Sequence, residues 1–498
     1  MRPTTPVQRE SRAAHGGSAI NADQDQQGKE HIVRNRFGIH RFVQASPLRR
    51  RALLETSAVL AAAWLAIASP SPRALAADQP AAGSVTDATK TIAPVQNKNQ
   101  VYPTPDYTGE FLSRSTLTGD WGGTRQEWAN KGITLDAYLT HVGMGVVSGG
   151  RDTGWEYTGR GEIDLNLDTA KLGLWPGGLF SVIAEGHFGR SIFPHTGALL
   201  PADLNEVIPE VDDSFVIPQL MYTQFLSEKH GFFVGKMTTI TPNSGDMNEF
   251  AHGKGDHQFL NTAFCADPVI LLTAPYSTFG AGVIALPIKD LVITAAALDP
   301  HGRADSAQLD HLFSDGVTIN LEGRYTTHFF DMTGHQLLGG TYSTSSYTDL
   351  DQRALNLIIS GLPTQHADSS WSAYYNCDQY FYQPDPKVNK GIGLFARAGV
   401  SDGQANPIHW FASGGIGGKG MISGRPNDAF GIGYYYTWIA DTQITSRLDF
   451  ADAQGVEAFY DIALTPWLHL TPDVQWIQPS QERVDDSWIV GFRLYMAF

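Results

Sequence analysis

Residues 488–498 have the sequence WIVGFRLYMAF, with a large apolar side chain at every even position and Arg493 among the odd ones. Successive side chains of a strand point to opposite faces, so a strand here has one apolar face and one face that carries a guanidinium. An apolar face that ends on an aromatic residue is typical of the closing strand of a bacterial outer-membrane barrel. The alternative is an amphipathic strand of a soluble β-sandwich. The rest of the chain has to distinguish the two.

The composition favours a β protein with many turns and many aromatic side chains. The 498 residues include 51 Gly, 25 Phe, 18 Tyr and 11 Trp, but only 2 Cys. No stretch after residue 76 approaches the roughly 18 apolar residues that a membrane helix needs. Residence in a membrane would therefore require a closed barrel, which is the other way to satisfy every backbone polar group in lipid.

The charge balance bears on partners. The chain carries 51 Asp and Glu against 35 Lys and Arg, a net charge of −16. Nucleic-acid binding requires a basic face, so we expect no nucleic-acid partner. The same excess of acid weakens the idea of a pore lined purely by Lys and Arg.

The N-terminal segment has the pattern of an export leader. Arg49, Arg50 and Arg51 precede an apolar run over 52–68, and Ala-Leu-Ala follows at 74–76. A basic region, an apolar core and a small-residue site predict a signal peptide, here residues 1–76 with cleavage after Ala76. Residues 77–132 follow as a flexible lead-in that ends in a short helix near 120–132, with Asp120 or Thr124 close to its cap.

From Ile133 onward the apolar pattern has a period of two. In residues 157–168, for example, Ile163, Leu165 and Leu167 alternate with polar and charged residues. Alternation of this kind predicts strands with one apolar face. We place sixteen of them at 134–146, 157–168, 178–189, 216–226, 231–238, 278–286, 291–298, 316–326, 335–343, 371–381, 391–400, 408–416, 429–439, 455–464, 468–477 and 487–498.

Periodicity alone cannot tell a barrel from a sandwich, but connection lengths can. Short connections at 227–230, 287–290 and 465–467 alternate with long ones at 191–214, 239–277 and 344–370. Short periplasmic turns and long external loops are the arrangement of outer-membrane barrels. With the leader and the aromatic end, this asymmetry predicts an all-β fold: a single transmembrane antiparallel barrel of about sixteen strands over 133–498, preceded by a short periplasmic helix.

Several blocks of sequence resemble one family. Residues 117–133 (LTGDWGGTRQEWANKGI) are similar to the N-terminal region of OprB-type carbohydrate-selective porins. The similarity returns at Gly235 and Lys236, and in the blocks 259–264 (FLNTAF), 393–403 (GLFARAGVSDG), 414–436 (GGIGGKGMISGRPNDAFGIGYYY) and 457–479 (EAFYDIALTPWLHLTPDVQWIQP). The resemblance implies a sixteen-stranded outer-membrane barrel that passes glucose and other sugars. The long N-terminal extension, Cys265 and Cys377 depart from the family pattern.

A sugar presents hydroxyls in many directions and apolar ring faces, so a selective path needs polar groups and aromatic rings. On the face opposite the apolar one, the candidates for the pore lining are charged residues or histidine. An alternative role, compatible with the first, is a salt-bridge lattice that stiffens the wall. The candidates are Arg160, Glu162, Asp164, Glu185, His187, Lys236, Glu322, Arg324, Arg397, Glu457, Asp461, Asp473 and Arg493.

The connection at 239–277 is too long for a simple hairpin. In porins generally the loop at this place folds inward and narrows the bore, so the resemblance implies the same here. The alternative is an exposed polar loop. Its candidate constriction residues carry groups that bond hydroxyls: Asp246, Asn248, Glu249, His252, Asp256 and Asn261, with Lys254, His257 and Gln258 beside them.

The sequence contains only weak indications of metal binding or catalysis. Asp246, His252, Asp256 and His257 could be imagined as metal ligands, but HExxH spacing is missing. His187, His409 and His469 lack the GxSxG elbow of a hydrolase. We therefore expect no catalytic residues, no metal and no cofactor. After export a bond between the two cysteines is permitted, and two unpaired thiols are favoured.

These observations predict a passive, carbohydrate-selective porin of the bacterial outer membrane, with small sugars and outer-membrane lipid as its partners. The alternatives are an outer-membrane barrel enzyme of the lipid-hydrolase type, a general diffusion porin and a secreted carbohydrate-binding sandwich. The preferred sugar and the oligomeric state stay open.

Overall fold

The structure is a computed structural model that describes residues 101–206, 214–239, 248–306, 309, 311–353 and 364–498, all within one compact unit, 79–498. The proposed leader, its cleavage site and Asp246 lie outside the described residues. None of the helices in the described ranges is long and apolar enough to cross a membrane.

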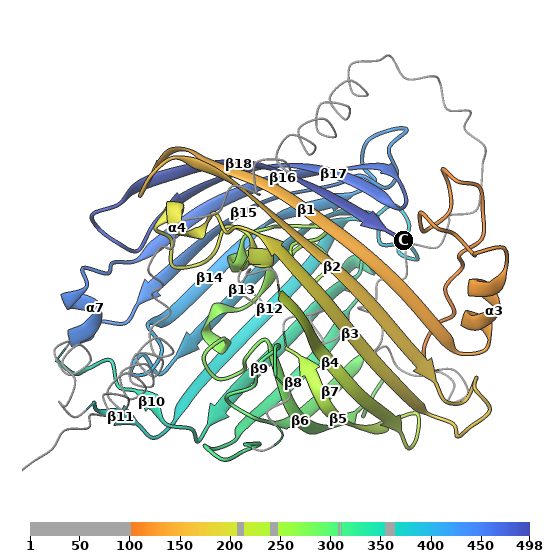
Figure 1. Ribbon diagram of the computed structural model, residues 1–498, viewed down its shortest axis with the longest axis horizontal. Helices are drawn as coiled ribbons and strands as arrows, with labels where there is room; N and C mark the ends of the chain where they lie inside the picture. The colour runs from red at the N-terminus through yellow and green to blue at the C-terminus, as the bar shows by residue number, and fades with distance from the viewer. Residues whose placement is uncertain (1–100, 207–213, 240–247, 307–308, 310, 354–363) are drawn as a thin grey trace, which may run out of the picture. The chain divides into compact units, whose positions relative to one another are not determined.

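The described residues contain sixteen strands that close into one antiparallel barrel (Figure 1). Their bounds match the predicted ranges to within a few residues, because the period-two pattern is continuous in most of them. The strands are β1 (Ile133–Gly150), β2 (Gly154–Asp168), β3 (Gly178–Gly189), β4 (Ser214–Phe225), β5 (His230–Thr238), β6 (Ser277–Ala285), β7 (Leu291–Leu298), β8 (Thr318–Thr327), β9 (Gly334–Ser343), β12 (Ser370–Tyr382), β13 (Gly391–Ser401), β14 (Ile408–Lys419), β15 (Ala429–Ile439), β16 (Ala453–Thr465), β17 (Leu468–Gln478) and β18 (Asp485–Ala497).

The last strand closes the barrel against the first, as the sequence predicts. In the β1–β18 pair, Tyr138 is opposite Ala497 and Val142 is opposite Arg493. The two faces of β18 differ as expected: Trp488 is 51% exposed, whereas Arg493 is 0% exposed. The apolar face of this strand is therefore the outer face, and the face with the guanidinium is the inner one.

The connections predicted to be short and those predicted to be long lie at opposite ends of the barrel, as expected. Residues 226–229 and 466–467 make tight connections, whereas 190–213, 239–276 and 344–369 join strands at the other end. The last of these carries a small separate sheet of β10 (Tyr347–Thr348) and β11 (His366–Ala367). Short helices also lie in the connections: α4 (Phe193–Thr196), α5 (Thr262–Cys265) and α7 (Gln443–Arg447), with the 3₁₀ turns η3 (Leu204–Glu206), η5 (Pro268–Ile270) and η6 (Phe329–Asp331).

The predicted helix before the first strand is α3 (Thr124–Asn130). Its N-cap is Gly123, in the left-handed conformation with φ 95°, and not Asp120 or Thr124. Arg125 is buried and donates to Asp136 Oδ1 of β1 at 2.8 Å. Its guanidinium also lies 3.9 Å from the centre of the Tyr107 ring, so this arginine fixes the helix to the start of the barrel.

Candidate functional site: a constricted lumen

The connection between β5 and β6 crosses the inside of the barrel. Asn248 Nδ2 donates to Asn376 Oδ1 of β12 at 2.8 Å, and Lys254 Nζ donates to Glu162 Oε2 of β2 at 2.7 Å. In the order of the sixteen strands, β12 and β2 are diametrically opposite. Residues 248–254 therefore span the lumen from one wall to the other, and Figure 1 shows this stretch in green within the ring of strands. We call the described residues 248–276 the inner segment.

Three inward arginines bind carbonyl groups of the inner segment. Arg160 of β2 donates to Lys254 O at 3.2 Å, and Arg397 of β13 donates to Ala251 O. Arg493 of β18 donates to Gly255 O at 3.1 Å and to Gln258 O at 2.7 Å. Guanidinium groups have several donors in a fixed plane, which suits them to hold a loop backbone that lacks the partners of a regular element.

Inward carboxylates bind donors of the same segment. Glu457 of β16 accepts from the backbone N–H groups of Leu260 and Asn261, at 2.6 Å and 2.9 Å. Glu185 of β3 is fully buried and accepts from Lys254 Nζ at 2.6 Å and from Tyr276 OH at 2.7 Å. Each carboxylate thus accepts two bonds, which compensates for its removal from water.

Lys254 is the most strongly held cation of the inner segment. Its amine lies between the carboxylates of Glu162 and Glu185. Burial alone would lower the pKa of Lys254, but these two carboxylates outweigh burial and hold that pKa well above its ordinary value. The ammonium therefore stays charged, and the ion pair persists at neutral pH.

Glycines on the inner wall make room for the aromatic rings of the inner segment. Gly393 and Gly417 pair across β13 and β14, and a side chain at either position would meet the Phe250 ring. On β15, Gly431 pairs with Gly417 and Gly433 pairs with Gly415. A side chain at Gly431 would meet the Phe259 ring, and one at Gly433 would meet the Phe264 ring. The Gly-rich sequence of these strands therefore marks a close approach of another segment, as Gly inside strands often does.

A second connection supports the inner segment. In the loop between β3 and β4, Leu204 N donates to Leu260 O at 2.9 Å, and Asn205 Nδ2 donates to Gly255 O at 3.2 Å. Pro201 O accepts from Thr262 N at 3.1 Å. Two loops thus fill one half of the lumen together.

The structure separates the predicted lining residues into groups. Asp461 and Asp473 bond to neighbours on the inner wall, Thr471 and Gln475 respectively, and Asp164 is buried on β2. His187 lies 3.2 Å from Glu185. Those that bond directly to the inner segment are Arg160, Glu162, Glu185, Arg397, Glu457 and Arg493.

Lys236 differs from the other predicted lining residues. It pairs with Leu220, and both Leu220 and the neighbouring Val234 are exposed on the outer face. Its amine donates to Ala304 O and Ser306 O of an end loop, each at 2.9 Å. The structure therefore places Lys236 on the outer face, with its amine extended to the loop at the end of the barrel.

The predicted constriction residues mostly contact the wall. Glu249 Oε1 accepts from Asn389 Nδ2 at 2.6 Å, Asp256 lies 3.4 Å from Arg160 NH2, and Asn261 Nδ2 donates to Gln475 Oε1 at 3.0 Å. The backbone N–H of His252 donates to Gln258 Oε1 at 2.8 Å. Among the described residues, no group of three or more His, Cys, Asp or Glu is arranged to hold a metal ion.

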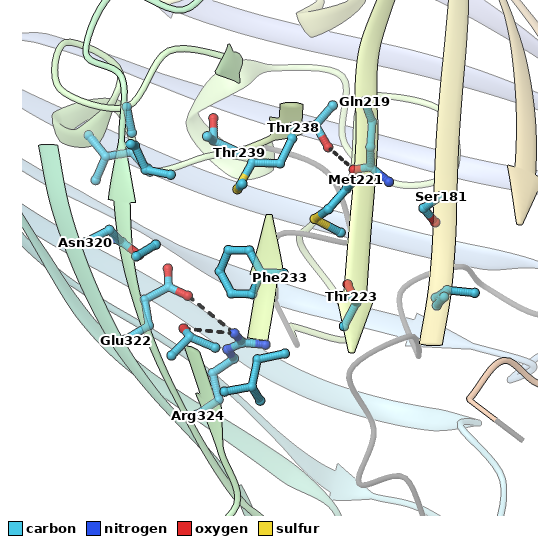
Figure 2. A pocket seen from close by; sticks show the side chains of 18 of the residues that line it. Ser181, Gln219, Met221, Thr223, Phe233, Thr238, Thr239, Asn320, Glu322 and Arg324 are labelled. Atoms are coloured by element: carbon cyan, nitrogen blue, oxygen red, sulfur yellow. Dashed lines mark hydrogen bonds and ion pairs between the residues drawn. The ribbon is translucent and has the colours of Figure 1, made fainter. Parts of the chain in front are cut away.

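The other half of the lumen contains an open slot (Figure 2). The slot is bounded by strands β3 to β8, by Tyr374 of β12, and by Ile270 and Ala274 of the inner segment. Of the predicted residues, Glu322 and Arg324 line it, whereas Gln219, Phe233 and Tyr374 were not among the predictions. These three are neutral or apolar, so a search for inward charges could not find them.

Both thiols are free. Cys265 lies in the inner segment, where its Sγ donates to Phe259 O at 3.1 Å. Cys377 pairs with Ala396, an exposed residue of the outer face. The wall separates the two side chains, in line with the favoured prediction of unpaired cysteines.

A closed sixteen-stranded barrel with an apolar outer face and a polar, loop-narrowed lumen is a pore-forming protein of the bacterial outer membrane. A family model described as "Carbohydrate-selective porin, OprB family" matches residues 152–498. The chain belongs to this family, and it is a carbohydrate-selective porin of the outer membrane.

Relatives agree with this assignment. The chain is 22% identical to Porin B of Pseudomonas aeruginosa over 429 residues, which covers 77% of this chain and 91% of that protein. It is also 22% identical to the putative porin QuiX of Acinetobacter baylyi, over 77% of this chain and 93% of that protein. The high-pH structure of Pseudomonas putida OprB superposes with a TM-score of 0.70 at 20% identity, covering 78% of this chain and all of that one, which supports the same fold.

Proposed function

We propose that this porin supports passive diffusion of small neutral sugars such as glucose, and that the inner segment sets the size of the path. The observation that carries the proposal is the span of residues 248–254 between opposite walls, at β12 and β2. A segment fixed at both ends narrows the bore without filling it, since the slot along β3 to β8 lies beside it. Release requires weak binding, so a slot with a few polar groups suits transport better than a deep pocket.

The inward charged residues have two roles in this proposal. Arg160, Glu185, Arg397, Glu457 and Arg493 position the inner segment, because their bonds go to it. Glu322 and Arg324 lie along the path and contact the solute. Lys236 is left out of the path because it lies on the outer face with Leu220.

The test is single-channel conductance in planar bilayers with a panel of sugars as blockers. Deletion of residues 245–256 removes the crossing, so we expect a larger conductance and weaker block by glucose. Unchanged traces would overturn the proposed role of the segment. A wild-type channel that no sugar blocks, but that passes sugars strictly by size, would instead indicate a general diffusion porin.

Lipid and oligomeric partners complete the proposal. Large apolar side chains of the outer face, such as Phe215, Leu338 and Trp410, are exposed on the barrel and suit contact with lipid tails. Loss of membrane partitioning in the absence of detergent would contradict this. Mass determination in detergent would distinguish a monomer from a trimer.

A further inference from the structure

The slot is covered at one end by residues from the N-terminal part of the chain. Leu179 of β3, Phe225 of β4 and Ile284 of β6 line the slot, and each is 2% exposed. Val101 and Tyr102 pack with these three residues in one apolar cluster. Leu179 lies at the start of β3 and Phe225 at the end of β4, beside short connections, which places the cluster at the periplasmic end of the barrel. Val101 and Tyr102 therefore cover the slot at its periplasmic end.

Two side chains from the end of β2 and the turn that follows it hold this N-terminal stretch, which we call the strap (residues 101–106). Asp168 Oδ2 accepts from the backbone N–H groups of the first two strap residues, at 2.9 Å and 3.2 Å. Lys171 Nζ donates to Tyr102 O at 2.8 Å and to Thr104 Oγ1 at 2.6 Å. The position of the strap over the slot therefore depends on one carboxylate and one ammonium.

The strap is attached less firmly than the residues that follow it. It forms neither helix nor strand, so no backbone ladder holds it. The next residue, Tyr107, is 2% exposed and donates its hydroxyl to Asp136 Oδ1 of β1 at 2.8 Å. Further on, Leu117 N donates to Ala497 O of β18 at 2.7 Å. A stretch with few bonds, next to a firmly attached one, opens at a lower free energy than the barrel does, so the strap can leave the wall while Tyr107 stays in place.

From this geometry we infer that the strap is a gate at the periplasmic end of the slot. In the closed state, which the structure shows, Val101 and Tyr102 cover the slot. In the open state the strap turns about Tyr107 and leaves that end clear. The apolar residues beneath the strap favour the closed state, because opening exposes them to water. This inference rests on the proposed path through the slot, to which it adds an exit that opens and closes.

The first measurement is the single-channel conductance of Lys171→Met and Tyr102→Ala in potassium chloride. Lys171→Met removes two hydrogen bonds of a charged group, so we expect the ratio of open to closed gate to rise about tenfold or more, with a larger mean conductance. Tyr102→Ala removes a covering side chain and should act in the same direction. Lys229→Met is the matched control, because it removes the same charge from an exposed site on the periplasmic turn between β4 and β5.

The second measurement follows the strap itself. Leu286 belongs to the apolar cluster beneath the strap and is 6% exposed. In a background that lacks Cys265 and Cys377, a water-soluble maleimide should label Leu286→Cys slowly while the strap is intact. We expect labelling about tenfold faster when Lys171→Met is added, and an unchanged rate with Lys229→Met. Heat-dependent gel mobility of each variant verifies that the barrel has folded.

The outcomes separate the gate from the proposed function. Faster labelling with unchanged conductance would show that the strap moves without controlling the path, and would overturn the gate. Equal labelling rates in all variants would overturn it too, because neither Lys171 nor Tyr102 would then hold the strap closed. Glucose block is recorded on the same channels. If glucose fails to block the wild type while both strap variants conduct more, the proposed function fails and the gate stands.

Discussion

Lys254 Nζ lies 2.6 Å from Glu185 Oε1, so a cation of the inner segment is bound to a carboxylate of the barrel wall that is fully buried. The same amine contacts Glu162 at 2.7 Å. The far end of the crossing is bound to β12 by the amide of Asn248 and by the backbone N–H of Glu249, which donates to Asp378 Oδ2 at 3.1 Å. The strongest electrostatic attachment of the inner segment is therefore at its β2–β3 end.

Lys254→Met should release this end. Removing one partner of a buried ion pair costs about 3–5 kcal/mol, because the other charge is left buried and unpaired. We expect a noisier channel of larger mean conductance. Lys131→Met is the control, since Lys131 pairs with Glu127 on the exposed surface of α3. A quiet channel of wild-type conductance in Lys254→Met would show that the ion pair does not hold the segment.

The same pair predicts a pH dependence. Because the pKa of Lys254 is raised above its ordinary 10.5, its contribution to stability is complete below pH 10.5 and is lost as pH rises through the higher value. We expect constant single-channel noise from neutral pH up to about pH 10, and increased noise only beyond that. The Lys254→Met variant should lack this alkaline transition. A transition in the wild type near neutral pH would contradict the assignment.

The glycine side of the lumen predicts a steric effect. A side chain in place of Gly433 would meet the ring of Phe264, and overpacking of this kind costs about 1–3 kcal/mol. Gly433→Val should therefore displace the inner segment and raise conductance. Gly323→Val is the control, since Gly323 lies in a strand with open space around it. Equal conductance of the two variants would remove the steric argument.

Cys265 should be chemically inert in the folded porin. Burial raises the pKa of its thiol well above the ordinary value, and the thiolate is the reactive form. In a Cys377→Ser background we expect a water-soluble maleimide to label Cys265 only after denaturation. Rapid labelling of the native protein would indicate that the inner segment leaves its place.

Much of the fold could be predicted from the sequence, because one face of each strand is apolar and the turns interrupt that pattern. The length of the connection after β5 excluded a simple hairpin, and the inward course of its described part was expected only from the resemblance to porins. The sequence could not show which inward charges face the path. Arg493 and Glu457 have the pattern of lining residues, and only the structure shows that the inner segment covers them. Lys236 was misplaced because Phe232, Phe233 and Val234 are all apolar, so β5 has no clear alternation.

The central claim is that the path runs between the inner segment and the wall formed by β3 to β8. Cysteine accessibility tests it directly, in a background that lacks Cys265 and Cys377. Thr223 lines the slot, whereas Ser413 is an inward residue of β14 on the filled side. We predict that a charged methanethiosulfonate reagent lowers the conductance of Thr223→Cys channels in one step and leaves Ser413→Cys channels unchanged. The reverse result would place the path on the other side of the inner segment and contradict the account.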